Sequence, residues 1–149
     1  MKFDFRFESL LRYRRSLRDE CQRALGEVIT RRETLQQQRH QIQNQLGEQS
    51  EQLRQIGLET VLNVDGARSR QYYRTVLESE LAAVHKQQEL AGHQLNRARQ
   101  ALVEADRQVQ VLEKLKERQL QEYTEHTRRY EQRDLEDIWQ GTHQTKEPK

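Results

Sequence analysis

Cysteine, proline and long apolar runs are almost absent from this sequence. The one cysteine, Cys21, excludes a disulfide within the chain and favours a reducing compartment, so the cytoplasm is the default location. The one proline, Pro148, leaves all earlier positions free of a ring that would interrupt helical hydrogen bonding. The longest apolar run, residues 81–84, is far too short to span a membrane. Residues 1–6 carry charges where a secretory signal needs an apolar block.

An excess of charge of one sign is missing as well. The chain has 26 basic and 24 acidic residues, interspersed, and a net charge of +2, which is too weak a field to favour nucleic-acid binding. Hydrophobic residues make up 33% of the chain and charged residues 34%. This composition has too few apolar residues for the core of a globular protein, but too many Leu, Ala and Val residues for a disordered tail. Strong helix formers dominate the rest. We therefore expect helices that bury one narrow stripe.

The second half of the sequence carries the clearest periodic pattern. Residues at alternating steps of four and three form a seam that is mostly apolar as far as Leu112 and continues to Tyr130. A repeat of 3.5 residues sustained over this length is typical of a left-handed coiled coil. The seam positions are Leu77, Leu81, Val84, Gln88, Ala91, Leu95, Ala98, Leu102, Ala105, Val109, Leu112, Lys116, Gln119, Tyr123, His126 and Tyr130.

The first half repeats less regularly. Its apolar positions shift by one residue before Leu46, which predicts a stutter in the coiled coil. Polar residues at three seam positions predict weaker packing in this half; they are Arg31, Gln38 and Gln45. The apolar seam positions are Leu10, Leu17, Cys21, Ala24, Val28, Leu35 and Ile42, followed by Leu46, Leu53 and Ile56.

A break between the two periodic halves allows the chain to fold back on itself. The Asp65-Gly66 pair is a turn signal, and Asp65 or Ser69 is a candidate helix cap. We predict an all-α fold, a single elongated antiparallel two-helix coiled coil forming one domain over residues 1–149. The predicted parts are a helix over about 4–56, a turn over 57–69, a helix over about 70–139 and a flexible tail over 140–149. A turn centred near residue 65 would place Phe7 opposite Tyr123.

No residue pattern points to catalysis, a cofactor or a metal site. The five histidines lie far apart in sequence, no second cysteine is present, and no glycine-rich phosphate loop occurs. We therefore predict a non-enzymatic protein. Aromatic residues that a two-helix seam is too narrow to bury are candidate partner anchors, and packing and binding remain equally open for Tyr73 and Trp139.

Three segments near the two ends of the sequence are distinctive: residues 1–12, which read MKFDFRFESLLR, residues 112–118, LEKLKER, and residues 130–138, YEQRDLEDI. These segments resemble the flagellar export protein FliJ family. The resemblance implies a cytoplasmic component of the flagellar type III protein export apparatus, similar to the coiled coil of the rotary ATPase gamma subunit. Such a protein would be peripheral to the cytoplasmic face of the inner membrane, through the export apparatus only.

The resemblance also implies partners and contact residues. The partners are a hexameric export ATPase (FliI-like), whose ring the coiled coil enters like a stalk and regulates, an export gate protein (FlhA-like) and export chaperones. The implied ATPase contacts are Phe3, Phe5, Phe7, Arg12, Arg14, Arg15, Tyr123, Tyr130 and Trp139. The implied gate contacts are Gln38, Ile42, Gln45, Gln49, Tyr73 and Leu77. Two alternatives stay open: the stalk of a virulence type III secretion system, and a generic scaffold that dimerises through parallel helices.

Overall fold

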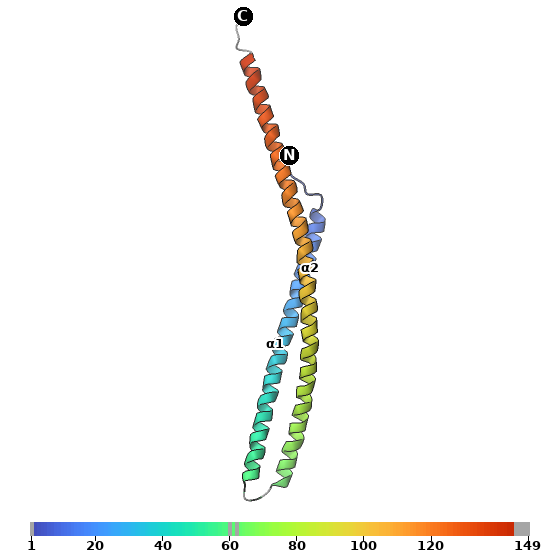
Figure 1. The fold of residues 1–149 in the computed structure, drawn as a ribbon, viewed down its shortest axis with the longest axis vertical. Coiled ribbons are helices and arrows are strands. Elements are labelled where there is room, and N and C mark those ends of the chain that lie inside the picture. The colour runs from blue at the N-terminus through green and yellow to red at the C-terminus, as the bar shows by residue number, and fades with distance from the viewer. Residues whose placement is uncertain (1, 60, 62, 145–149) are drawn as a thin grey trace. The chain divides into compact units, whose positions relative to one another are not determined.

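Two helices make up almost all of the structure, a computed structural model that describes residues 2–59, 61 and 63–144. Helix α1 spans Glu8–Leu58 and helix α2 spans Val64–Gln144 (Figure 1). They run antiparallel and pack against each other, which confirms the predicted all-α helical hairpin. Neither helix is apolar enough over a sufficient length to cross a bilayer, within the residues that the structure describes.

The chain divides into two compact units. The terminal unit combines Met1–Arg18 with Glu104–Lys149, and the turn-side unit is Asp19–Val103. Each unit contains one stretch of α1 and one of α2, and each has its own apolar cluster.

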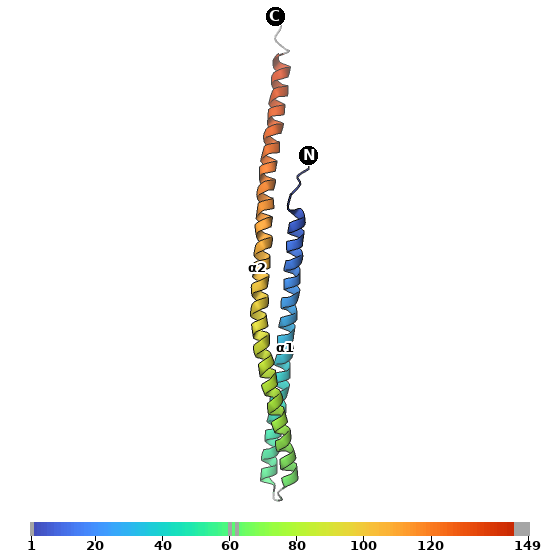
Figure 2. The same ribbon diagram turned by 90° about the vertical axis from the view of Figure 1, so that its right-hand side faces the viewer.

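The seam predicted for α2 is confirmed from Leu77 to Tyr123. Every predicted position in that range is buried or half-buried. The last two positions, His126 and Tyr130, are exposed. In the terminal unit α2 continues past the beginning of α1, as Figure 2 shows, so these two residues have no helix opposite them.

The stutter predicted for α1 is wrong. Leu10 and Ala24 are exposed, and their neighbours Leu11 and Leu25 take the seam instead. The observed seam of α1 continues without interruption in steps of three and four, and all of its positions except Arg32 are buried or half-buried. These positions are Leu11, Arg14, Arg18, Cys21, Leu25, Val28, Arg32, Leu35, Arg39, Ile42, Leu46, Gln49, Leu53 and Ile56. Arginine can occupy such positions because its aliphatic stem packs while its charged head stays in water. Arg31, Gln38 and Gln45, predicted at the seam, are exposed.

The turn is shorter than predicted because α2 begins at Val64, six residues early. The Asn63 side-chain oxygen accepts a hydrogen bond from the Gly66 backbone nitrogen at 3.0 Å, and the Asn63 carbonyl accepts one from Ala67 at 3.0 Å. This is the geometry of a helix N-cap. The cap is therefore Asn63 rather than Asp65 or Ser69, and the Asp65 carboxylate lies in the first turn, where the helix dipole favours it.

At its other end α2 is longer than predicted. It continues through Gln144, so residues 140–144 are helical rather than part of a tail. Residues 145–149, the rest of the predicted tail, lie outside the described residues.

The shorter turn changes which residues of the two helices meet. In the terminal unit Phe3 rather than Phe7 packs on Tyr123, and Lys116 pairs with Glu8. Residues of α1 therefore lie opposite residues of α2 about one helical turn earlier than predicted.

Candidate functional site

Aromatic side chains close the seam at the beginning of α1. The helix starts at Glu8 rather than near residue 4, and residues 2–5 are not helical. The Phe3 ring lies 5.6 Å from the Tyr123 ring, between centroids, and Phe5 is 4% exposed in a cluster with the fully buried Leu11 and Val109. The predicted packing of Phe7 on Tyr123 is wrong, because the non-helical segment carries Phe3 to that position.

A signal for this segment was present in the sequence. Phe3, Phe5 and Phe7 recur at a period of two, which in extended backbone places them on one side, whereas a helix would put Phe5 on the face opposite to Phe3 and Phe7. In the structure Phe3 and Phe5 pack against the helices, and Phe7 stays at the edge of the cluster with its ring 5.9 Å from that of Phe5. Phe3, Phe5 and Tyr123 therefore hold the terminal unit together, and Phe7 is the most accessible of the four.

Ion pairs join the two helices of the terminal unit. Lys116 Nζ lies 2.8 Å from Glu8 Oε2, and Arg15 Nη2 lies 3.1 Å from Glu113 Oε1. Arg18 Nη1 lies 3.9 Å from Asp106 Oδ1. These side chains are partly exposed, so each pair stabilises the unit only modestly. The ion pairs also fix the positions of these side chains. Arg15, one of the predicted ATPase contacts, is already paired with Glu113 of α2.

The Glu8 carboxyl provides a direct test of this pairing. The hydrogen bond from Lys116 holds the Glu8 pKa below its usual value, and the charges of Lys116 and Arg12 act in the same direction. A lowered folded-state pKa stabilises the fold above the unfolded-state pKa, and this contribution is lost as the pH falls through the folded-state pKa. Replacing Lys116 by Met is expected to raise the Glu8 pKa in a carboxyl NMR titration.

Lys114→Met is the matched control, since Lys114 is an exposed lysine two residues away. It should leave the titration of Glu8 almost unchanged. A Glu8 titration curve that is the same in the wild type and in Lys116→Met would contradict the pairing.

The remaining predicted ATPase contacts are accessible to different degrees. Arg12 is exposed, and Tyr130 and Trp139 are 63% and 62% exposed. The Trp139 ring stacks on His143 with centroids 4.0 Å apart. Arg14 is half-buried and lines a groove of about 390 Å³ together with Leu10.

Two exposed residues that are not named among the predicted ATPase contacts lie beside Trp139. Leu135 and Ile138 are both largely exposed and, with Trp139, are spaced as residues on one helical face. We call Leu135, Ile138 and Trp139 the apolar stripe of α2. Their spacing is visible in the sequence, but it falls outside the seam pattern and was not recognised as a surface.

The predicted gate contacts all lie in the turn-side unit. Gln38 and Gln45 are exposed and Tyr73 is 43% exposed, so these three are accessible. Ile42 is half-buried and packs against Leu35, Val84 and Ala91, and Gln49 is half-buried. Leu77 is only 2% exposed, so its side chain belongs to the packing between the helices and not to an accessible surface.

Metal-binding chemistry has no visible basis in the part of the chain that the structure describes. There, no three His, Cys, Asp or Glu side chains are grouped closely enough to hold an ion. Cys21 is half-buried and has no disulfide partner.

Comparison with known proteins agrees with this architecture. The family model described as "Flagellar FliJ protein" matches residues 1–147, nearly the whole chain. Searches of curated proteins and of solved structures gave no significant match. The matched family is associated with flagellar-type protein export. On this match, which covers both helices completely, the chain belongs to the flagellar FliJ protein family.

Proposed function

We propose that this chain is a non-enzymatic, stalk-like regulator of the hexameric export ATPase. The observation that carries the proposal is the part of α2 beyond Tyr123, which has no helix opposite it (Figure 2). Except for the half-buried Thr127, residues 124–144 are exposed, and they include Tyr130 and the apolar stripe. Apolar side chains gathered on one face of an exposed helix are typical of a surface that binds a partner.

The proposed mechanism uses the asymmetry of this helix. A single helix in the centre of six identical subunits presents different side chains to each of them. A ligand changes the balance between open and closed states only if it binds those states differently. Contacts of Tyr130 and the apolar stripe with one subunit at a time would favour one state in that subunit. The terminal unit would thereby raise the rate of ATP hydrolysis without any chemistry of its own.

The turn-side unit is proposed to contact the export gate. Its accessible polar and aromatic groups at the predicted positions are Gln38, Gln45 and Tyr73. Amides donate and accept hydrogen bonds, and tyrosine combines a large apolar ring with a hydroxyl, so the three groups suit a protein interface. Through this contact the protein would reach the membrane only indirectly, and assist the delivery of substrates by export chaperones.

Two single substitutions test whether the two contacts are separate. Trp139→Ala is expected to reduce stimulation of the ATPase and to leave gate binding unchanged, whereas Tyr73→Ala is expected to do the reverse. Both side chains are exposed, so neither change should alter the helix content. The measurements are ATP turnover by the purified export ATPase, binding to the cytoplasmic part of the gate protein, and circular dichroism. Loss of both activities in either variant would contradict the separation, and two unaffected activities in both variants would contradict the proposed contacts.

A further inference from the structure

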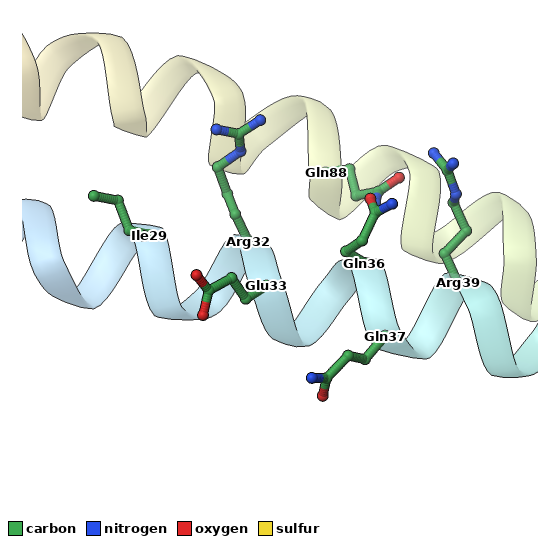
Figure 3. Close-up of a pocket in the computed structure, with 7 residues that line it drawn as sticks. All are labelled: Ile29, Arg32, Glu33, Gln36, Gln37, Arg39 and Gln88. Carbon is green, nitrogen blue, oxygen red and sulfur yellow. The ribbon is translucent and has the colours of Figure 1, made fainter.

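We propose that the turn-side unit has a second protein-binding site, at which Arg32 and Arg39 bind two carboxylates spaced seven residues apart on an acidic helix. The site is a groove of about 660 Å³ between α1 and α2. Its lining includes both arginines and Gln36 from α1, and Gln88 from α2. Figure 3 shows both guanidinium groups reaching from α1 towards α2, on either side of Gln36 and Gln88.

The spacing of the two arginines suits a helical ligand. Seven residues correspond to about 10.5 Å along a helix at 1.5 Å per residue. Two acidic residues seven positions apart on another helix have the same separation and point to the same side. The amides of Gln36 and Gln88 lie between the arginines and can hydrogen-bond polar side chains in the middle of such a ligand.

Neither arginine has its charge balanced within the described chain. No ion pair joins Arg32 or Arg39 to any described residue. The one acid that lines the groove is Glu33, and Figure 3 shows its carboxylate pointing away from both guanidinium groups. Arg39 is also half-buried, and a partly dehydrated cation gains more from a carboxylate than a fully hydrated one does.

The terminal unit shows what comparable arginines bind when acids are within reach. There Arg15 and Arg18 pair with Glu113 and Asp106, two acids seven residues apart on α2. In the turn-side groove α2 contributes the neutral Gln88 instead. The groove again has two arginines, here seven residues apart, but its lining includes no acid from α2. An acidic helix from another protein is therefore the occupant with complementary charge.

This groove is distinct from the predicted gate contact. At 3.6 residues per turn, Gln38 and Gln45 fall on one flank of the α1 seam formed by Leu35 and Ile42, and Arg32 falls on the other. The proposal concerns a different surface and does not depend on the ATPase or gate contacts proposed above.

A designed peptide provides the probe. An alanine-based helical peptide with two glutamates seven residues apart is titrated into the ¹⁵N-labelled full-length chain, and the side-chain amide signals of Gln36 and Gln88 are followed by NMR. These signals should shift, and added salt should weaken the binding. Replacing Arg32 and Arg39 together by Gln should weaken it by roughly fivefold to thirtyfold, the range expected for losing two partly exposed ion pairs. A peptide with glutamines in place of both glutamates should produce no comparable shifts.

Arg97→Gln combined with Arg99→Gln is the matched control. It removes the same charge from exposed positions of the turn-side unit that do not line the groove, so peptide affinity should stay within about twofold of the wild type. Circular dichroism confirms that each variant is folded, and Arg32→Gln alone changes only an exposed side chain. Unchanged binding by the Arg32 and Arg39 variant, or an equal loss in the control, would overturn the proposal. So would larger shifts of Gln36 and Gln88 with inorganic phosphate or phosphatidylserine vesicles than with the peptide.

Discussion

Deleting the residues after Tyr130 is expected to remove most of the stimulation of the export ATPase. The deletion takes away the apolar stripe, Leu135, Ile138 and Trp139, which is the largest group of exposed apolar side chains in this part of α2. Buried aromatic anchors of an interface each contribute about 2 kcal/mol or more, so we expect the concentration for half-maximal stimulation to rise by at least about thirtyfold.

The same deletion should leave the fold intact. The removed side chains that the structure describes, those of residues 131–144, are exposed and have no part of α1 opposite them, so the remaining chain should stay folded with an unchanged melting temperature. ATP turnover is measured over a range of concentrations of the intact and shortened proteins. Leu90→Ala, which also removes an exposed apolar side chain but in the turn-side unit, serves as the control and should stimulate normally. A shortened protein that stimulates as well as the intact one would refute the role of the apolar stripe.

The second large effect is expected from replacing Leu11 by Ala. This side chain is 0% exposed and packs in the cluster of Phe5 and Val109. Truncating a fully buried leucine to alanine costs about 2–5 kcal/mol, because apolar contacts are lost and a cavity remains. We expect a loss of that size in the free energy of unfolding, measured by urea denaturation followed by circular dichroism.

Leu10→Ala is a control of the same chemistry at the neighbouring position. Leu10 is 40% exposed, so its truncation should cost no more than about 1 kcal/mol. The pair also decides between the two possible seams of α1, since the sequence pattern placed Leu10 rather than Leu11 between the helices. A larger loss for Leu10→Ala than for Leu11→Ala would contradict the observed packing.

The sequence alone predicted the helical hairpin and the α2 seam correctly. In α2 the apolar residues from Leu77 to Leu112 leave little ambiguity, because adjacent seam positions are separated by mostly polar residues. In α1 the prediction failed where apolar residues are adjacent, as at Leu10 and Leu11, or where an arginine such as Arg39 holds a seam position. A pattern that classes each residue only as apolar or polar cannot choose between two adjacent leucines, and it does not show which arginine lies at the seam.

The contact surfaces were predicted less completely than the fold. The exposure of Tyr73 and Trp139 agrees with their proposed use as anchors, but Phe5 and Leu77 are packed inside. Whether an aromatic or leucine side chain is buried depends on what lies opposite it, and this is set by the register between the helices.

That register is what the tertiary structure decided. Helix formation and the regular 3.5-residue seam of α2 are local properties, so composition and spacing were sufficient to predict them. The register depends on where the turn begins and ends, and the cap at Asn63 moved the start of α2 by six residues. This shift, together with the non-helical segment before Glu8, brought Phe3 to Tyr123 and left Phe7 at the edge. The contact of Phe3 with Tyr123 joins residues far apart in sequence, so the local pattern of each helix does not specify it.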